Sequence, residues 1–326
     1  MFKSITTIIL ATFLMVSCGK PNSPEDYTGG YKIISKVHTY GDANDVIVDV
    51  NYAYIAQGEV GLAIFDISDP KNPTLVTNQS DGVKGYSTKL IKKDNMLYIA
   101  AGGSGFNMVN VSDINNLQVR DQDVNGKLVN IHLMGDYLIN SLSETGILIA
   151  NIESPIYIDY RGSTHVDGFV KGLTTTEDQS KMFVATGEMG LSLFDISFFD
   201  DGYGVFPLLN SVNLPGYAES VVLDESKQVA FIACGNAGLQ VVDYSDNTNL
   251  KIIGSYDTAG YAKEILFEND KIYLTASGLQ VFDVSSPSNP KILGIIDTKY
   301  ALGVTVDANY IYVADKEEGL IVIKKK

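Results

Sequence analysis

Few side chains in this 326-residue chain are of the types that carry out acid–base or metal chemistry. The three histidines are His38, His132 and His165, and they share no metal-binding spacing such as His-x-x-x-His. The sequence also lacks a Gly-x-Ser-x-Gly nucleophile elbow and a phosphate-binding glycine loop. His132 is the best single candidate for an acid or base, although a hydrogen-bonded structural histidine is the interpretation we favour. We therefore predict no metal ion and no cofactor.

The two cysteines, Cys18 and Cys234, are expected to have different roles. Cys234 ends the apolar run 229–234, and nothing in its surroundings would lower its pKa. We expect it to be a buried thiol and not a nucleophile. Cys18 follows an apolar segment near the N-terminus and is interpreted below as a lipidation site. With Cys18 lipidated, an intramolecular disulfide is excluded.

Aspartate or asparagine recurs at six equivalent points: Asp66, Asn110, Asn151, Asp195, Asp243 and Asp283. Such a row could suggest a ring of ligands. A short acceptor at the end of a strand, however, commonly binds the backbone N–H groups of the turn that follows. Equivalent residues of a repeat also lie too far apart to share one ion. We therefore expect six structural turn acceptors.

These acceptors belong to a repeat that predicts the fold. The phrase Gly-Leu-Ala-Ile-Phe-Asp at 61–66 returns in variant form with spacings of 44, 41, 44, 48, 40 and 41 residues, at Gly105, Gly146, Gly190, Gly238, Gly278 and Gly319. This period corresponds to one four-stranded propeller blade. The clearest repeat contains four β-rich runs separated by turn-forming residues, at 261–267, 271–275, 279–284 and 291–296. The sequence therefore predicts an all-β, seven-bladed β-propeller of four-stranded blades.

The last repeat is incomplete, because it ends with a third strand at 319–323. The segment 31–37 precedes the first full repeat and is similar to the fourth strand expected at 251–256. We expect this N-terminal strand to complete the last blade, which would remove an unpaired edge and close the ring. The predicted propeller domain spans residues 31–326.

Aromatic and polar residues recur where the chain passes from one predicted blade to the next. The aromatic residues are Tyr86, Phe169, Tyr217, Tyr261 and Tyr300. The polar residues, which should point toward the channel mouth, are Asp45, Lys89, Asn130, Ser220 and Glu264. An aromatic and polar concavity is a reasonable binding surface, so we predict a binding site at Asp45, Tyr86, Lys89, Asn130, Tyr217, Tyr261, Glu264 and Tyr300.

Glutamates in the hairpins of the same face suggest that this face is acidic; they are Glu59, Glu144, Glu188, Glu317 and Glu318. In the alternative interpretation, the aromatic residues pack between blades and the glutamates are solvated turn tips. A separate insertion at 198–207, rich in aromatic residues, should lie on the opposite face. It forms either a contact patch or a plug over its own blade.

The repeat resembles the LVIVD family of bacterial cell-surface repeats, whose pattern is Gly-Leu-x-Val-Phe-Asp-Val-Ser-x-Pro-x-x-Pro. The resemblance spans roughly 31–326, is strongest at 61–76 and 278–293, and is weaker at 146–160. It implies a β-propeller and a cell-surface setting. The family has no general assigned activity, so the resemblance implies no catalytic residue.

The N-terminus has the features of a lipoprotein signal. Lys3 is followed by an apolar run too short to span a bilayer, which ends in Leu14-Met15-Val16-Ser17-Cys18 and resembles a bacterial lipobox. We predict a signal peptide at 1–17 and a lipidated Cys18 with a linker at 18–30; the alternative is an ordinary signal peptide cut nearby. Multiple acyl chains would give a stable membrane anchor. Because Gly19 is not Asp, we expect the outer membrane if the cell is Gram-negative.

The predicted mature protein is acidic. Loss of Lys3 with the signal peptide changes the formal net charge from −15 to −16. Such a charge disfavours nucleic acid as a partner.

The leading hypothesis is a cell-envelope lipoprotein that binds another envelope macromolecule, a protein or a polysaccharide. Alternatives are a small-ligand or glycan-binding lipoprotein, and a propeller hydrolase or lyase with its site at the channel mouth. The propeller fold does not choose among these.

Overall fold

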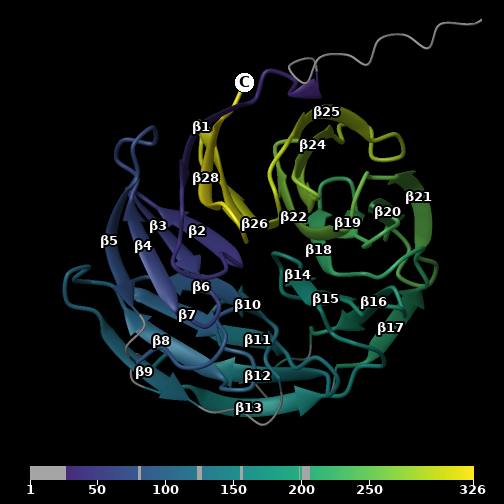
Figure 1. Cartoon of the computed structure of the whole chain (residues 1–326). Helices are drawn as coiled ribbons and strands as arrows, with labels where there is room; N and C mark the ends of the chain where they lie inside the picture. Colours follow the sequence, from purple (N-terminus) through teal and green to yellow (C-terminus); the bar gives the residue numbers. More distant parts are fainter. Residues whose placement is uncertain (1–26, 80–81, 123–126, 155–156, 198, 200–205) are drawn as a thin grey trace, which may run out of the picture.

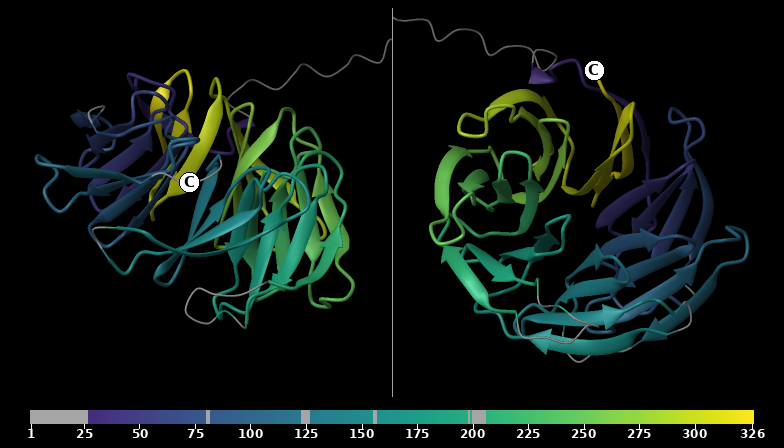
Figure 2. Two further views of the ribbon diagram at one scale, coloured as in Figure 1. Left: turned by 90° about the horizontal axis from the view of Figure 1, so that it is seen from below. Right: turned by 180° about the vertical axis from the view of Figure 1, so that it is seen from behind.

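The computed structural model describes residues 27–79, 82–122, 127–154, 157–197, 199 and 206–326. In this part of the chain, 28 strands form seven four-stranded sheets, and neighbouring strands run antiparallel. The sheets are arranged as blades in a ring around a central axis, which Figure 1 and the right view of Figure 2 show from opposite sides. The prediction of an all-β, seven-bladed propeller is confirmed. No helix in the described residues is long and apolar enough to cross a membrane.

Each blade contributes one strand to each of four concentric positions. The innermost strands are β2 (Asp45–Asp49), β6 (Lys89–Lys93), β10 (Asn130–Met134), β14 (Gly172–Thr175), β18 (Ser220–Asp224), β22 (Ala262–Glu268) and β26 (Ala301–Val306). The second strands are β3 (Tyr52–Ala56), β7 (Met96–Ala100), β11 (Tyr137–Ser141), β15 (Lys181–Ala185), β19 (Val229–Ala233), β23 (Lys271–Ala276) and β27 (Tyr310–Asp315). The third strands are β4 (Leu62–Asp66), β8 (Phe106–Asn110), β12 (Ile147–Asn151), β16 (Leu191–Asp195), β20 (Leu239–Asp243), β24 (Leu279–Asp283) and β28 (Gly319–Lys324). The outermost strands are β5 (Thr74–Gln79), β9 (Gln118–Gln122), β13 (Asp159–Thr164), β17 (Leu208–Val212), β21 (Lys251–Tyr256), β25 (Lys291–Ile296) and β1 (Lys32–Val37).

The N-terminal strand closes the ring, as predicted. The last blade has the order β1-β28-β27-β26, so its outermost strand comes from the start of the chain. β1 pairs antiparallel with β28, from Lys32 beside Lys324 to Val37 beside Leu320. Figure 1 shows these two strands side by side near the C-terminus. The first and last strands of the ring therefore hold each other without a covalent link.

The repeated glycine is required by the backbone at the start of the third strand. Gly319 has a φ of 80°, in the left-handed region that side chains other than glycine rarely adopt. A Cβ atom there would also overlap the carbonyl oxygen of Val37 in β1. The same two constraints apply at Gly190 and Gly238, which approach the carbonyls of their own outermost strands.

The repeated aspartate or asparagine is a turn acceptor, as predicted. Asp66 Oδ1 accepts hydrogen bonds from the backbone N–H of Ser68 at 2.8 Å and from its hydroxyl at 2.6 Å, which hold the pKa of Asp66 below its usual value. The backbone contact recurs at Asn110, Asn151, Asp195, Asp243 and Asp283, at 2.8 to 2.9 Å. Each acceptor bonds within its own turn, which excludes the alternative of a shared ligand ring.

The hydrophobic core lies between the blades. Seven clusters of buried apolar residues are present in the described residues, and each combines side chains from two neighbouring blades. The cluster between the last blade and the first contains Leu320 and Val322 from β28 together with Ile55 and Phe65. Cys234 is buried in another cluster, and burial raises the pKa of its thiol to about 12, as expected for a structural cysteine.

Part of the aromatic insertion lies outside the described residues, at 198 and 200–205. Two of its described aromatic residues belong to the core. Phe199 meets Tyr137 edge-on with ring centroids 4.8 Å apart, and Phe206 is 4% exposed. These two side chains pack inward, as in the plug alternative, and do not form an exposed contact patch.

Replacing Gly319 with alanine should lower the free energy of unfolding by about 2 kcal/mol or more, because the new Cβ is strained and overlaps the closing strand. Urea unfolding of the purified protein measures this. The control is Gly103→Ala, where an added Cβ meets nothing within 4 Å, and it should change stability by less than about 1 kcal/mol. Equal losses in both variants would contradict the role assigned to Gly319.

Candidate functional site

The innermost strands place one equivalent residue from each blade around the channel. We call this set the inner ring: Asp45, Lys89, Asn130, Gly172, Ser220, Glu264 and Gly303. All five polar residues predicted to lie near the channel mouth belong to it. Their common position follows from the repeat, since six of the seven pair with the last or next-to-last residue of the second strand of their blade. Glu264 lies in an irregularity of β22, where its backbone N–H donates to the Thr275 hydroxyl of the second strand at 2.9 Å.

Four of these polar side chains form one network that crosses the channel. Lys89 Nζ lies 2.9 Å from Glu264 Oε2 and 3.3 Å from Asp45 Oδ1. The Ser220 hydroxyl donates to Glu264 Oε1 at 3.1 Å. Lys89 and Glu264 belong to the second and sixth blades, so their ion pair spans the ring. The sequence predicted these residues but not that they would meet.

Two glycines in the inner ring allow the blades to approach closely. A Cβ on Gly303 would lie 2.7 Å from the Cα of Asp45, and a Cβ on Gly172 would lie 3.0 Å from the Cα of Ser220. Real Cβ atoms need more room than this, so only glycine fits at both places. The narrow channel that results brings Lys89 within reach of Glu264.

Burial and pairing set the charge state of the network. Burial alone would lower the pKa of Lys89, but the carboxylates of Asp45 and Glu264 raise it well above its usual value, so the amine stays protonated. Burial raises the pKa of Asp45, which is 3% exposed, while Lys89 and the Leu90 N–H at 2.9 Å oppose the shift. The network therefore contains a permanent cation held by two carboxyl groups.

The Lys89–Glu264 pair separates the channel into two cavities, and both residues line each of them. The larger cavity, of about 550 Å³, also contacts Lys316 and Gly102 from the hairpins between second and third strands. It therefore opens on the hairpin face, and we call it the funnel. The second, of about 470 Å³, extends along the inner strands past Thr174 and Phe267.

The funnel is lined by a second set of equivalent residues, one from each blade and one position before the inner ring. We call this set the wall ring: Asn44, Thr88, Val129, Lys171, Glu219, Lys263 and Leu302. Its members differ strongly in chemistry, and all lie outside the seven core clusters. Sequence reasoning missed them, although the repeat register that identified Asp45 and Lys89 would have found them one residue earlier.

Five of the eight predicted binding residues line the funnel: Tyr86, Lys89, Asn130, Glu264 and Tyr300. The other three touch residues of the site. Asp45 binds Lys89; the Tyr261 hydroxyl donates to Glu219 at 2.6 Å; and Lys171 Nζ lies 5.2 Å from the centre of the Tyr217 ring. The structure therefore brings five of the eight to the funnel and places the other three in contact with its lining residues.

Two of the tyrosines also agree with the alternative that the aromatic residues pack between blades. The rings of Tyr86 and Tyr261 lie over glycines in the hairpins of the preceding blades, so that a Cβ on Gly58 or Gly235 would come within about 3 Å of them. Tyr86 is nevertheless 39% exposed, and its hydroxyl donates to Asp42 at 3.1 Å. Each ring thus packs against a neighbouring blade and still presents surface to solvent.

The predicted acidic face does not describe the funnel. Its lining contains five lysines and only two glutamates, and none of the predicted hairpin glutamates lines it. Glu318 instead pairs with Lys36 at 2.6 Å. The error came from counting charges at the hairpin tips, whereas the inner strands and their approaches supply most of the lining.

His132 has a structural role, as favoured from the sequence. Its Nε2 lies 3.0 Å from the Thr175 hydroxyl of the next blade, and burial lowers the pKa of the imidazole to about 4. It does not line the funnel. Among the described residues, no group of three or more His, Cys, Asp or Glu side chains is placed to hold a metal ion.

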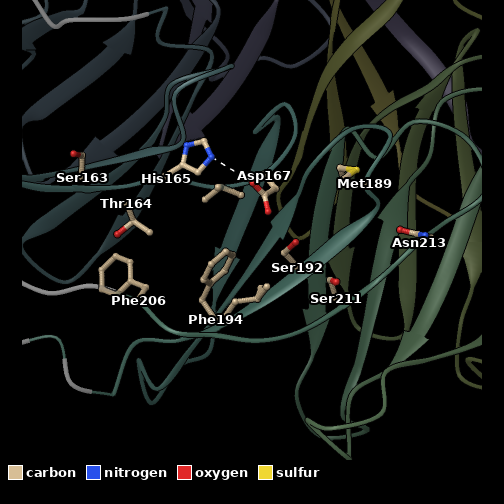
Figure 3. A pocket seen from close by; sticks show the side chains of 12 residues that line it. Ser163, Thr164, His165, Asp167, Met189, Ser192, Phe194, Phe206, Ser211 and Asn213 are labelled. Carbon is tan, nitrogen blue, oxygen red and sulfur yellow. Dashed lines mark ion pairs between the residues drawn. The ribbon is translucent and has the colours of Figure 1, made fainter.

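A further cavity of about 440 Å³ lies between β13 and the strands β16 and β17. Figure 3 shows Phe194 and Phe206 among the side chains that line it, and the pair His165–Asp167, whose Nε2 and Oδ1 atoms are 3.3 Å apart. The side chains of this pair are 75% and 82% exposed, so water competes with their contact. The cavity lacks the convergence of charged groups seen in the funnel.

Comparison with known families identifies the repeat. The model of the LVIVD repeat matches residues 40–81, 215–258, 259–298 and 299–323. These matches contain the first, fifth and sixth blades, and strands β26, β27 and nearly all of β28 from the seventh. The second, third and fourth blades have the same four-stranded fold outside these matches. A comparison with curated proteins found no match.

Solved β-propellers are similar to the chain in fold. The WD40 β-propeller domain of Doa1 aligns with a TM-score of 0.72 at 10% identity, covering 91% of this chain and 97% of that one. The β-propeller domain of Cps50 (Swd1) from Myceliophteria thermophila gives 0.69 at 11% identity, covering 90% and 98%. The computationally designed Ika8 protein gives 0.66 at 9% identity, covering 90% and 100%. At such identities the likeness concerns the fold alone.

Lowering the pH should destabilise the protein through His132. Its folded pKa of about 4 lies below the ordinary 6.5, so its contribution is present above pH 6.5 and is lost as the pH falls toward 4. Between pH 7.5 and 4.5, His132→Gln should lose about 2 to 3 kcal/mol less stability than the unmodified protein. Urea unfolding at both pH values measures this.

His165→Gln is the matched control, because the side chain of His165 is 75% exposed. It should retain the pH dependence of the unmodified protein. An unchanged pH dependence in His132→Gln would refute the assignment.

Proposed function

Because this chain carries LVIVD repeats folded as a seven-bladed β-propeller, we propose that it is a lipid-anchored protein of the bacterial cell envelope. In this proposal the funnel binds another envelope macromolecule, and the outer membrane is its location in a Gram-negative cell. The signal peptide at 1–17 and Cys18 lie outside the described residues, so the anchor rests on the sequence alone.

The wall ring is the observation that carries the binding proposal. It places seven side chains of differing chemistry around one solvent-open concavity. Lys263 and Leu302 lie in innermost strands, and the other five each directly precede the innermost strand of their blade. Recognition sites commonly combine a preformed concave shape with a few converging polar groups and aromatic surface. Tyr86 and Tyr300, which are 39% and 51% exposed, supply the aromatic surface here.

The direction of the closing strand determines how a tether at Cys18 would orient the propeller. β1 ends with Val37 beside Leu320, next to the hairpin that places Lys316 in the funnel lining. It begins with Lys32 beside Lys324, at the opposite end of β28. A chain reaching β1 from a membrane anchor therefore arrives at the face opposite the funnel. An anchored propeller would then present the funnel away from the membrane.

The Cys18→Ser variant should move the protein from the membrane fraction to the soluble fraction of cells, because the acyl chains would have no attachment site. Fractionation together with incorporation of labelled palmitate measures this. Cys234→Ala leaves the anchor intact and should remain membrane-bound and labelled. Continued labelling of Cys18→Ser would refute lipidation at this residue.

Capture of an envelope macromolecule by the full-length protein should depend on the funnel. Tyr300→Ala should reduce the amount retained at least about fivefold, since an exposed aromatic side chain in an interface commonly carries a large share of the binding energy. The retained material is quantified after cross-linking in intact cells. The matched control is Tyr157→Ala on the opposite face, whose side chain is similarly exposed at 55%.

Equal capture by Tyr300→Ala and the unmodified protein would count against the funnel as the binding surface. If nothing were retained by the unmodified protein, the binding proposal itself would fail.

A further inference from the structure

The funnel has a charge opposite to that of the chain. The protein carries a formal net charge of −15, whereas the funnel lining contains five lysines and two glutamates. A concave site with low-dielectric walls concentrates the field of its own charges. The local excess of cations therefore acts on a ligand at the channel mouth despite the acidic outer surface.

Two of these lysines are already compensated. Lys89 is held by Asp45 and Glu264, and Lys316 Nζ lies 3.4 Å from Asp42 Oδ2. The other three, Lys127, Lys171 and Lys263, make no ion pair with any described residue. They come from the third, fourth and sixth blades, so three lysines without an ion-pair partner among the described residues surround one opening from different directions.

The surroundings of Lys263 disfavour its charge. Its side chain is solvent-accessible, yet it stands in the mouth of a concavity, where the surrounding protein displaces much of its water. This desolvation lowers its pKa, and the nearby cations Lys171 and Lys89 lower it further, while Glu219 and Glu264 oppose the shift. A bound anion would offset both unfavourable effects.

The remaining lining suits a sugar ring. A pyranose has faces rich in C–H groups and edges rich in hydroxyl groups. Tyr86 and Tyr300 offer exposed aromatic surface for such a face. The amide of Asn130 offers neutral donors and an acceptor for hydroxyl groups, and the Thr88 hydroxyl, which donates to the Ala100 carbonyl oxygen, offers a further acceptor. The volume of about 550 Å³ is typical of a small-ligand site.

We propose that the funnel binds an acidic saccharide unit, a sugar ring bearing a carboxylate or phosphate, with the anionic group among Lys127, Lys171 and Lys263 and the ring against Tyr86 and Tyr300. This inference rests on the proposed function and names the chemistry of its ligand. The Lys89–Glu264 pair limits the depth of binding, because it separates the funnel from the second cavity. The saccharide is therefore a terminal or looped unit that enters from one side and does not thread the channel.

An acidic peptide is the competing occupant, since its carboxylates would also pair with lysines. The tyrosines favour the saccharide, because a run of acidic side chains offers little surface to two exposed rings.

Calorimetric titration of the full chain in detergent tests the proposal with four probes: oligogalacturonate, glucose 1-phosphate, neutral maltotriose and hexaglutamate. We expect at least one acidic saccharide to bind roughly tenfold or more tightly than maltotriose and more tightly than hexaglutamate. The first two probes distinguish a carboxylate from a phosphate ligand. Raising the salt concentration from 50 to 200 mM should weaken this binding severalfold, since exposed ammonium groups are screened.

Two triple variants with the same change in net charge distinguish the effect of the funnel lysines on binding from the effect of the overall charge. Lys127→Ala, Lys171→Ala and Lys263→Ala together should weaken acidic-saccharide binding at least about tenfold. Lys71→Ala, Lys251→Ala and Lys291→Ala together remove three exposed lysines at the opposite ends of the blades and should change it less than about twofold. Replacing the three funnel lysines with arginine should retain binding, because the charge and donors remain.

Equal binding of maltotriose, tighter binding of hexaglutamate, or equal losses in the two alanine triples would overturn the acidic-saccharide proposal. Circular dichroism and thermal unfolding verify that both triples remain folded. If the full-length protein still captures an envelope macromolecule in a Tyr300-dependent way while no acidic saccharide binds, this inference fails and the proposed function stands. If capture itself is absent, the proposed function fails.

Discussion

Pairing of β1 with β28 is the constraint on which the rest of the molecule depends. The seven core clusters lie between blades, and the cluster joining the last blade to the first contains side chains of β28, the strand that β1 covers. Without the closing strand, β28 would be an open edge and the last blade would lose its outer layer. Closure also fixes the circumference of the ring, and hence how far apart the innermost strands stand. The geometry of the channel therefore follows from a contact at its outer rim.

Within that circumference, the side chains of the inner ring occupy the space between the innermost strands. Gly172 and Gly303 let neighbouring backbones approach, and the network around Lys89 fills the centre with groups that satisfy one another. Buried ion pairs often contribute little net stability, but leaving one partner unpaired is costly. We interpret the Lys89–Glu264 pair as the inner end of the funnel, which sets the depth of the funnel. Lys127, Lys171 and Lys263 lie nearer the opening and can pair with the charges of a ligand.

The fold could be predicted closely because short sequence patterns within each repeat determine the strands and turns of its blade. The glycine with positive φ, the aspartate that binds its turn and the missing last strand are all visible in the sequence. Only part of the site could be predicted from the sequence. Repeat register identified Asp45, Lys89 and Glu264 but not their meeting, because a contact between positions 175 residues apart depends on ring size. Lys171 and Lys263 were not predicted, because repeat register locates the approach to the channel but does not show that the side chain one position earlier also lines the funnel. Hairpin glutamates suggested an acidic surface, since sequence alone does not separate the tip of a hairpin from the lining beneath it.

The wall ring has a consequence for how such proteins can diversify. Each of its seven members comes from a different blade and lies outside the seven core clusters, although Leu302 is buried and Asn44 donates to the Ser87 carbonyl oxygen. Most of these positions can therefore change without altering the clusters that hold the blades together. The channel mouth therefore has seven side-chain positions, one on each blade of the same backbone fold. Gene duplication followed by single-residue changes could produce a series of propellers with different ligand preferences at almost no cost in foldability. Because these seven positions lie outside the core clusters, they are suitable sites for saturation mutagenesis aimed at changing ligand specificity.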